Sequence, residues 1–496
     1  MTAPRSIRLL TIGACLLLCG VVVAQQPFDL DPSFRTEIGQ AYVSSILPLD
    51  GGQVLASGLM RFSGELTDKR LVRLNTNGTR DETFNNSGLG QGKLTAWLND
   101  IFYVGTSQTV RRILPTGLQD PGFIEMNLGP YFSSLQGGDY HVFPDGRVLM
   151  SGLHLLDDPL RGFVGGYCLC WFSNQGYLDT TRVHRTCSGV LYHIEELPNG
   201  QFMGSGSTST YDGQAAGNIF RFNADGSFDP TFDAHITYGE AFDFVALGDG
   251  RVYAAGRFMI QGIADTLSIV RFMPDGSLDP VFDHLLDFRV QEMTTFQGKG
   301  LLRKLHLLDE NRLVCMGNFE LVDGEPRGCV CMVDSLGNLS EEYFAGAGCG
   351  NFVYQGEVSG AATGLYAGPD GSYYICGAYH GYDDGTTNDT TQRMVSRLYG
   401  LDVGMEERQV ELHASLKLHP NPASTWVAFD YDLRSLAKDA KLIVLDATGR
   451  EVWRASLVVS KTQVLWDVRG VQPGTYAAIL ENGGARLTTE RLVLQQ

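Results

Sequence analysis

Residues 219–232 read IFRFNADGSFDPTF and residues 269–282 read IVRFMPDGSLDPVF, so one unit recurs at a spacing of fifty positions. Each copy joins an apolar segment, an Asp-Gly turn and an Asp-Pro-x-Phe ending. Asp-Gly between alternating apolar segments is a strong β-hairpin signal, because glycine tolerates the positive φ that tight hairpin turns require. The two stretches therefore predict repeated β-hairpins.

The Asp-Pro-x-Phe ending recurs along the chain in one register. Asp31 and Asp81 lie fifty positions apart, as do Asp179, Asp229 and Asp279, and weaker copies occur at 168–181 and 330–344. The repeat motif that we identify comprises Asp31 and Phe34, Asp81 and Phe84, Asp120 and Phe123, Asp229 and Phe232, and Asp279 and Phe282.

A second hairpin pattern, an apolar segment, a turn and a segment ending in Gly, precedes most of these endings. Its copies begin at Ile46, His141, Glu195, Val245, His306 and Tyr366, with a degenerate copy at Ala96. Two hairpins per unit make a four-stranded sheet, which cannot bury both faces alone. Radial stacking buries them and leaves only short edges. We therefore expect an all-β fold whose body is a seven-bladed β-propeller of four-stranded blades.

The two chain ends of this body offer two ways to complete the last blade. FDLDPSF at 28–34 precedes every hairpin, so it is expected to supply the fourth strand of the last blade and remove two open edges. The alternative is that Gly400-Leu401-Asp402 forms a decayed fourth strand.

The repeats resemble the delta-60 repeat family of bacterial surface and secreted proteins. The resemblance rests on DGSFDPTF at Asp225–Phe232 and DGSLDPVF at Asp275–Phe282, and it covers roughly residues 28–403. It implies a β-propeller fold and provides no catalytic residues.

A different pattern begins after Gly404. Fewer than ninety residues with alternating apolar positions and no cysteine predict a small antiparallel β-sandwich. This tail resembles the C-terminal sorting domain of type IX secretion substrates of Bacteroidetes-type bacteria. The residues that carry the resemblance are His419, Pro420, Asn421, Pro422 and Ala423, Gly449 within VLDATGREV, Gly474, Tyr476 and the final RLVLQ. It implies recognition by the type IX secretion machinery, removal of the tail, and a cargo that is anchored to the surface or released.

The N-terminus has the pattern of a signal peptide. Arg5 and Arg8 precede an apolar run from Leu9 to Val23, and Ala24 offers a small residue for cleavage. A lipoprotein site at Cys15 is the weaker alternative, because almost no apolar segment precedes it. The expected division is a signal peptide at 1–24, the propeller at 25–403, a linker at 404–412 and the sorting domain at 413–496. No stable membrane span is expected in the mature chain.

The charge and the cysteine content argue against two classes of ligand, nucleic acid and zinc. The formal net charge of −18 disfavours nucleic acid, because binding to phosphates depends on Lys and Arg. Removal of the signal peptide leaves eight cysteines, an even number that permits disulfides in an exported protein. Buried thiols or one or two cross-strand bridges are favoured over a zinc site, since the Cys-x-Cys pairs at 168/170 and 329/331 have no second ligand pair.

No catalytic, cofactor-binding or metal-binding set emerges from the motifs. His184 and His193 near Cys187 are the nearest approach to a metal or nucleophile cluster. The turns at 223–229 and 273–279 superficially suggest calcium sites. Asp157-Asp158 and Asp383-Asp384 are possible paired carboxylates for glycoside chemistry. Each has a structural explanation, because Asp and Asn stabilise tight turns through their own backbone.

These observations favour a secreted or cell-surface, non-catalytic binding or adhesion protein. Its ligand, a glycan or another surface protein, is not specified, and variable loops on repeated strands are the expected binding region. Two alternatives remain: an extracellular propeller hydrolase or lyase acting on polysaccharide in the central funnel, and a structural component of an extracellular layer.

Overall fold

The computed structural model describes residues 25–84, 88–106, 108–126, 131–291, 298–354, 357–401, 414–433, 440–457, 463–482 and 485–495. The chain separates into two compact units, 1–404 and 405–496. The expected signal peptide at 1–24 and linker at 404–412 lie outside the described residues. Strands make up the described secondary structure apart from one 3-10 turn, η1 (Leu98–Asp100), so the all-β class is confirmed. Within the described residues no helix is long and apolar enough to cross a membrane.

Seven up-and-down sheets follow one another through the described part of the first unit. Sheet 1 contains β1 (Ile38–Pro48), β2 (Val54–Phe62) and β3 (Lys69–Leu74); sheet 2 contains β4 (Leu94–Ala96), β5 (Phe102–Gly105) and β6 (Val110–Ile113). Sheet 3 contains β7 (Phe132–Val142), β8 (Val148–Asp158) and β9 (Phe163–Phe172); sheet 4 contains β10 (Val190–Glu196), β11 (Phe202–Ser207), β14 (Ile219–Phe222) and β15 (Phe228–Asp229).

Sheet 5 contains β16 (Ile236–Ala246), β17 (Val252–Ile260) and β18 (Leu267–Phe272); sheet 6 contains β20 (Leu301–Asp309), β21 (Arg312–Asn318) and β24 (Val330–Asp334). Sheet 7 contains β28 (Ala361–Ala367), β29 (Tyr373–Asp383), β30 (Asn388–Leu398) and the short β25 (Gly348–Cys349). Short accessory strands are β12 (Thr210–Tyr211) with β13 (Gln214–Ala215), β19 (Phe288–Arg289) with β22 (Leu321–Val322) and β23 (Glu325–Pro326), and β26 (Phe352–Tyr354) with β27 (Glu357–Ser359).

The Asp-Gly turns form as the hairpin signal predicts. Gly226 and Gly276 have φ of 83° and 91°, and the Asn223 N–H donates to the Ser227 carbonyl at 2.8 Å to close the turn. At Gly276 the turn also meets the preceding connection, because an added Cβ would lie 2.5 Å from the carbonyl carbon of Asp233. Glycine is therefore required there for both conformation and space.

The fourth strand is shorter than predicted. The Asp-Pro-x-Phe segment returns beside the third strand, but only sheet 4 has a two-residue strand there, β15, while sheets 1, 2, 3, 5 and 6 have a single bridge. In sheets 1 to 5 the Asp side chain accepts the N–H of the residue two positions ahead and so turns the backbone away from the third strand, which ends the ladder after one or two pairs. The repeating sheet thus has three extended strands and a bridged fourth segment.

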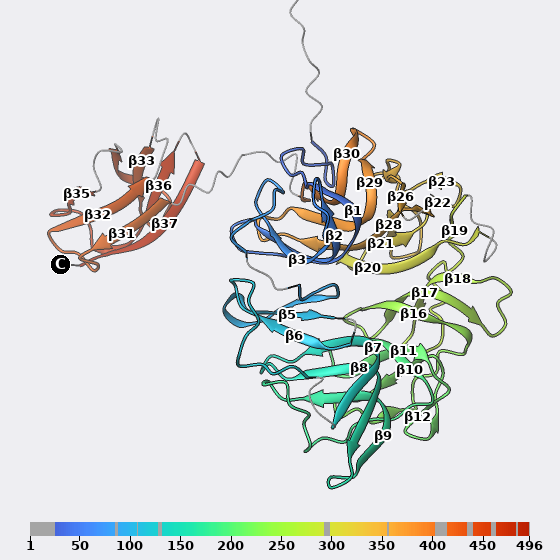
Figure 1. Ribbon diagram of the computed structural model, residues 1–496. Coiled ribbons are helices and arrows are strands. Elements are labelled where there is room, and N and C mark those ends of the chain that lie inside the picture. Colours follow the sequence, from blue (N-terminus) through green and yellow to red (C-terminus); the bar gives the residue numbers. More distant parts are fainter. Residues whose placement is uncertain are drawn as a thin grey trace, which may run out of the picture. The chain divides into compact units, whose positions relative to one another are not determined.

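The core of the first unit lies between sheets. Seven clusters of buried apolar side chains each combine residues of two adjacent sheets, and the sequence of sheet pairs runs from 1 and 2 through 6 and 7 to 7 and 1. Figure 1 shows the blue strands β1 to β3 beside the orange strands β28 to β30, and β1 contacts β28 directly. Each sheet therefore depends on its two neighbours for burial of its faces.

The N-terminal segment pairs with the last strand of sheet 7. Leu30 and Leu398 form an antiparallel bridge, the Phe28 N–H donates to the Tyr399 carbonyl at 3.0 Å, and the Tyr399 N–H donates to Asp29 at 2.9 Å. Segment 28–31 thus lies where the competing expectation placed Gly400-Leu401-Asp402. Asp402 is outside the described residues.

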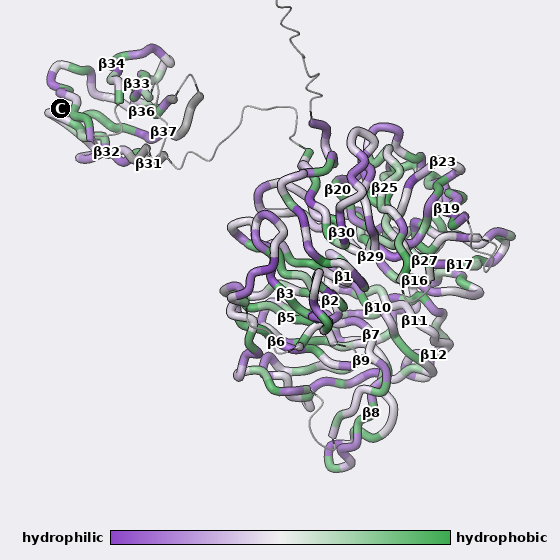
Figure 2. Tube along the Cα trace, turned by 45° about the horizontal axis from the view of Figure 1, so that its top comes forward, coloured by the Kyte–Doolittle hydropathy of each residue, from purple (hydrophilic) through white to green (hydrophobic). Residues whose placement is uncertain are grey.

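The second unit has two antiparallel sheets. One contains β31 (Ala414–His419), β32 (Trp426–Leu433) and β35 (Gln463–Asp467), and the other contains β34 (Glu451–Ser456), β33 (Ala440–Leu445), β36 (Gly474–Asn482) and β37 (Ala485–Leu494). Side chains of both sheets, among them Phe429 and Leu442, belong to one buried cluster. Figure 2 shows that hydrophobic residues follow the strands in both units, while hydrophilic residues occupy many connecting loops.

Candidate functional site

The first strands of the seven sheets carry one structurally equivalent residue each. These residues, which we call the inner set, are Ser45, Lys93, Asp139, His193, Asp243, Lys304 and Gly364; each lies opposite the same position of the second strand. In sheets 1, 4, 5, 6 and 7 the inner-set residue comes directly after a β-bulge. A bulge re-aims the side chains that follow it, so the repeat turns residues far apart in sequence toward one another.

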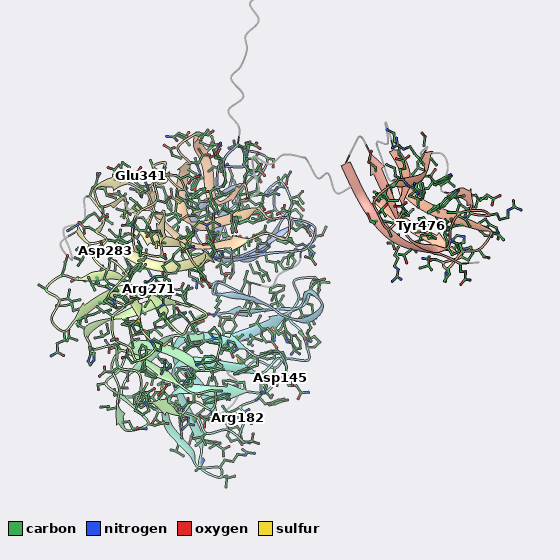
Figure 3. All side chains as sticks on the ribbon, turned by 180° about the vertical axis from the view of Figure 1, so that it is seen from behind. Asp145, Arg182, Arg271, Asp283, Glu341 and Tyr476 are labelled. Atoms are coloured by element: carbon green, nitrogen blue, oxygen red, sulfur yellow. The ribbon has the colours of Figure 1, made fainter. Side chains whose placement is uncertain are left out.

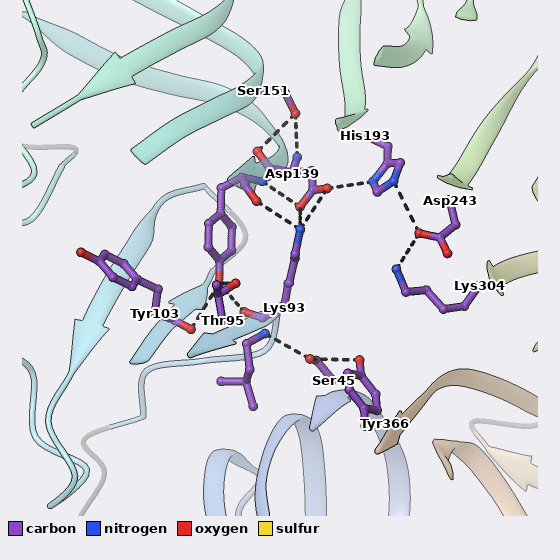
Figure 4. A network of polar contacts seen from close by, with 12 residues as sticks. Ser45, Lys93, Thr95, Tyr103, Asp139, Ser151, His193, Asp243, Lys304 and Tyr366 are labelled. Atoms are coloured by element: carbon purple, nitrogen blue, oxygen red, sulfur yellow. Dashed lines mark hydrogen bonds and ion pairs between the residues drawn. The ribbon is translucent and has the colours of Figure 1, made fainter. Parts of the chain in front are cut away.

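Five members of the inner set form a continuous chain of ionic contacts (Figure 4). The Lys93 Nζ donates to Asp139 Oδ1 at 3.2 Å, and Asp139 Oδ2 lies 2.8 Å from Nδ1 of His193. His193 Nε2 lies 3.6 Å from Asp243 Oδ1, which also accepts a 2.5 Å hydrogen bond from Nζ of Lys304. Cation and carboxylate therefore alternate, with His193 between the two carboxylates.

The two remaining positions complete the network through hydroxyl groups. Ser45 Oγ accepts hydrogen bonds from the Leu94 N–H at 3.1 Å and from the Tyr366 hydroxyl at 3.2 Å. Gly364 contributes no side chain, and the Tyr366 ring fills its place, since a Cβ on Gly364 would lie 2.5 Å from that ring. The seventh position is thus occupied by a residue two positions further along β28.

Two members of the network, Asp139 and Lys304, have shifted pKa values. Burial raises the pKa of the Asp139 carboxyl, but Lys93 and His193 outweigh burial and hold that pKa below its usual range. Burial lowers the pKa of Lys304, but the Asp243 charge outweighs it and the pKa is raised. Burial raises the pKa of Glu195, two residues after His193, and raises that of Tyr366 to about 12. Glu195 is the one group here with the raised pKa typical of a general acid.

One small cleft borders the network at its Lys93 and Asp139 end. A cleft of about 60 Å³ is lined by Lys93, Asp139, Tyr140 and glycines of sheets 2 and 3. Ligand pockets usually enclose about 300–1,000 Å³, so this cleft accommodates water rather than a sugar ring. A larger cleft of about 590 Å³ lies between sheets 5 and 6, lined by Leu247, Arg251 and Val281 among others.

The repeat-motif residues join neighbouring sheets. Asp279 accepts the Val281 N–H at 2.9 Å and the Nε of Arg271 at 2.7 Å, and the Arg271 guanidinium lies 5.0 Å from the centre of the Phe282 ring. Arg271, labelled in Figure 3, also donates to the Ser335 carbonyl of the next sheet at 2.6 Å. The same arrangement links Asp81, Arg73 and Phe84; Asp120, Arg112 and Phe123; and Asp229, Arg221 and Phe232.

The first copy of the motif acts across the chain ends. Asp31 lies 3.2 Å from the guanidinium of Arg397 on β30, and the Phe34 ring contacts that of Tyr374 at 5.4 Å between centres. The five motif copies therefore lie at separate sheet junctions and do not converge on one site.

Four of the sorting-motif residues, Asn421, Ala423, Gly474 and Tyr476, lie beside the last strand of the second unit, β37. Asn421 donates to the Arg491 carbonyl at 2.7 Å and accepts the Val493 N–H at 2.9 Å, while Ala423 forms a parallel bridge with Leu494. The peptide bonds before Pro420 and Pro422 are cis, and the His419 ring lies 3.2 Å from Asp430. Gly449 has a φ of 85° in a tight turn, and the hydroxyl of Tyr476, two residues after Gly474, donates to the Gln472 carbonyl (Tyr476 is labelled in Figure 3).

The other sequence candidates separate in space. His184 accepts the Trp171 N–H and burial lowers its pKa to about 4, Cys187 donates to the Gly189 carbonyl, and His193 belongs to the inner set. Within the described residues no group of three or more His, Cys, Asp or Glu side chains is arranged to hold a metal ion.

The paired carboxylates have local structural roles. Asp158 is buried and binds Arg161, whereas Asp157 is exposed. Asp384 accepts the Leu30 N–H at 2.7 Å and so anchors the N-terminal segment, while Asp383 accepts the Gly385 N–H. In the turns that suggested calcium, Asp225 and Asp275 accept hydrogen bonds from the serine two residues ahead.

Sequence reasoning missed the inner set apart from His193. The signal was present, because these residues lie one to three positions before the first residues quoted for the seven hairpin copies. The residue at this position differs from one repeat to the next, so a search for residues shared by all repeats does not find it.

Comparison with known proteins supports the repeat and the tail. A family described as a β-propeller domain of unknown function, DUF5122, matches residues 52–84, 197–232 and 247–282, and the secretion system C-terminal sorting domain matches residues 417–495. No curated protein matches the chain.

Solved structures give distant similarities. The extracellular domain of a hybrid two-component system protein from B. thetaiotaomicron is 10% identical with a TM-score of 0.36; the match covers 93% of this chain, which spans 57% of that one. A gluconolactonase from Xanthomonas campestris is 15% identical with a TM-score of 0.32, over 77% of this chain and 99% of the other. The chain therefore carries DUF5122 β-propeller repeats of the delta-60 type and a type IX secretion C-terminal sorting domain, and it is a secreted or outer-cell-surface protein.

Proposed function

We propose that this protein is a non-catalytic binding protein of the cell surface. Its body, residues 25–403, is a seven-bladed β-propeller closed by segment 28–31, and residues 413–496 form a β-sandwich that addresses it to the type IX machinery, with 404–412 as linker. The circular order of the buried clusters supports the propeller, and the shared core of the two sheets supports the sandwich. The repeat-motif residues stabilise blade junctions, and the sorting-motif residues hold the last strand in place.

The observation that carries the binding role is an exposed apolar face on sheet 3. Strands β7, β8 and β9 have 11, 11 and 10 residues, whereas the strands of sheet 2 have 3 or 4. Along this longer sheet alternate residues face solvent, and Tyr131, Leu135, Leu155 and Val164 are all more than 40% exposed. Leu160, at the hairpin tip, is 96% exposed.

The register shows that these residues share one face. Ser133 is the cross-strand partner of Leu155, which in turn lies opposite Gly166, and Asp157 lies opposite Val164. The opposite face carries the buried Leu156. Clustered exposed apolar residues are typical of interaction sites. Leu135, Leu155, Leu160 and Val164 are aliphatic and Tyr131 is the one aromatic residue among those named, which favours a protein partner over a glycan, for which several stacked aromatic rings would be expected.

A binding assay on cells tests the proposal. Purified mature protein is added to cells of the producing bacterium that lack the gene, with and without prior protease treatment of their surface. We expect saturable binding that protease abolishes and that Leu155→Asp with Val164→Asp reduces at least tenfold. Leu66→Asp, at a residue 93% exposed on sheet 1, is the matched control and should bind normally. Protease-resistant binding would indicate a glycan, and equal loss in the control would refute the assigned face.

The second candidate is a hydrolase or lyase, favoured by the convergence of Asp139, His193, Glu195 and Asp243. The mutual pairing of its charges and the 60 Å³ cleft weigh against it. A polysaccharide panel decides between the two: turnover by the wild type that disappears in Glu195→Gln, with folding unchanged, would favour the enzyme.

A further inference from the structure

Cys315 and Cys331 are direct cross-strand neighbours. They are paired residues of the antiparallel strands β21 and β24, and both side chains are buried in the cluster between sheets 5 and 6. Directly opposite residues of an antiparallel pair have Cα atoms about 4.5–5.5 Å apart, which is inside the range of about 4.4–6.8 Å seen for disulfides.

Cys329 and Cys349 are neighbours by a second type of pairing. Gly328 and Gly348 form a parallel bridge, and the Cys349 N–H donates to the Gly328 carbonyl at 2.8 Å. The two cysteines are the next residues along both segments, so their side chains lie side by side. Both side chains belong to the cluster between sheets 6 and 7.

Cys168 and Cys187 meet at the edge of sheet 3. Leu169 and Arg185 form an antiparallel bridge, and the Cys168 N–H donates to the Arg185 carbonyl at 2.8 Å. Cys187 lies two residues further on and packs against the buried cluster that contains Cys168. Burial raises the pKa of Cys168, whereas the hydrogen bond from Cys168 lowers that of Cys187, the least buried of the eight described cysteines.

The remaining two cysteines have other neighbours. Cys170 lies opposite Met150 within an aromatic cluster, and Cys376 hydrogen-bonds with Thr363. Since Cys376 also lies near Cys349, it is the competing partner that an experiment must distinguish.

We propose that the exported protein contains three disulfides, Cys168–Cys187, Cys315–Cys331 and Cys329–Cys349, and two buried thiols, Cys170 and Cys376. The sorting domain indicates a route through the periplasm, where disulfides form and persist. Two independent strand pairings place four of the eight described cysteines in couples, and Cys187 packs against the buried cluster that contains Cys168, so the proposal does not depend on any single contact.

The oxidant is a periplasmic thiol–disulfide oxidase. The thiolate of one cysteine, Cys187 in its pair, attacks the oxidase disulfide and forms a mixed disulfide, releasing one oxidase thiol. The thiolate of the second cysteine then attacks the sulfur of the first cysteine in this mixed disulfide. The attack forms the new S–S bond within the exported protein and releases the other oxidase thiol. The two protein thiols lose two protons and two electrons, and the oxidase is reduced to a dithiol. Because Cys315 and Cys331 are buried in the folded body, their oxidation precedes closure of sheets 5 and 6.

Alkylation of the natural product tests the pairing. Mature protein is collected from the surface or medium of producing cells, denatured in acid, alkylated without reductant and digested with trypsin and chymotrypsin. We expect two modified cysteines, Cys170 and Cys376, and six protected ones. Modification of all eight described cysteines, or a cross-link between Cys349 and Cys376, would overturn the assignment.

Single variants resolve the close pair Cys329 and Cys331, which lie two positions apart in one peptide. Cys331→Ser should make Cys315 newly modifiable and leave Cys349 protected, whereas exposure of Cys349 would show the opposite pairing. Cys170→Ser is the matched control and should leave six cysteines protected.

Discussion

Replacing Asp243 by asparagine removes the charge that joins His193 to Lys304 while preserving side-chain size. Asp243 is 1% exposed and accepts hydrogen bonds from the Lys304 ammonium at 2.5 Å and from the Leu305 N–H at 2.8 Å. Asparagine can still accept from Leu305, but its NH₂ group competes with the ammonium as a donor. The variant therefore leaves a cation without its carboxylate near the centre of the first unit.

The loss of stability in Asp243→Asn depends on how exposed the Lys304 side chain is. Removal of one member of a fully buried pair costs about 3–5 kcal/mol. The Lys304 side chain is 36% exposed, so water partly compensates it, and we expect Asp243→Asn to lower the free energy of unfolding by about 2 kcal/mol.

Urea unfolding of the mature protein, followed by tryptophan fluorescence, measures this loss. Asp243→Asn combined with Lys304→Met should recover part of it, because the second change removes the unpaired cation. Asp145→Asn, at a carboxylate 55% exposed and paired with Arg147, is the control, with an expected change below about 0.5 kcal/mol. An Asp243→Asn protein within that margin, or additive single changes in the double variant, would refute the role of the network.

Three further results are expected. Burial lowers the pKa of His154 to about 4, below the unfolded value of about 6.5; the unfolded state binds more protons between these values, so stability should fall as pH drops from 6.5 to 4, and His154→Gln should reduce the slope by up to about 1.4 kcal/mol per pH unit in urea titrations. Arg271→Met should cost about 2 kcal/mol in the same assay, because it removes one partner of a carboxylate that is only 3% exposed, while Arg251 stays paired with it at 2.9 Å. Arg147→Met at the surface should cost less than about 1 kcal/mol, and equal losses would argue against the sheet-junction role. Asn421→Ala removes two hydrogen bonds to β37, worth about 1 kcal/mol each, and should retain protein in the periplasm, as quantified by fractionation.

The sequence predicted what local chemistry determines. Asp-Gly turns such as Asp225-Gly226 specify hairpins without outside help, and the regular spacing of Asp229 and Asp279 exposed the repeat. The position of FDLDPSF ahead of all hairpins also predicted the pairing of the N-terminal segment with sheet 7. Strand lengths were less accessible, because the fourth segment ends where an Asp side chain captures the N–H two residues ahead, a contact that hairpin patterns do not reveal.

The inner set depends on distances that no local pattern encodes. Lys93, Asp139 and His193 lie 46 and 54 positions apart, and they meet because they occupy equivalent positions in the first strands of successive sheets, or directly before that strand in the case of Lys93. Their chemistry alternates instead of repeating, so similarity between copies hides them. The apolar face of sheet 3 was hidden for a related reason: Leu155 and Leu156 look alike in sequence, and strand register decides which one is exposed.

Amide hydrogen exchange of segments 25–34 and 395–401 in the mature protein tests most directly whether the chain ends close the circle of sheets. If Phe28, Asp31 and Tyr399 donate their N–H groups across this junction, both peptides should exchange as slowly as the interior strand β2. Exchange of segment 25–34 at the rate of an unstructured peptide, with β2 still protected, would contradict the closed arrangement.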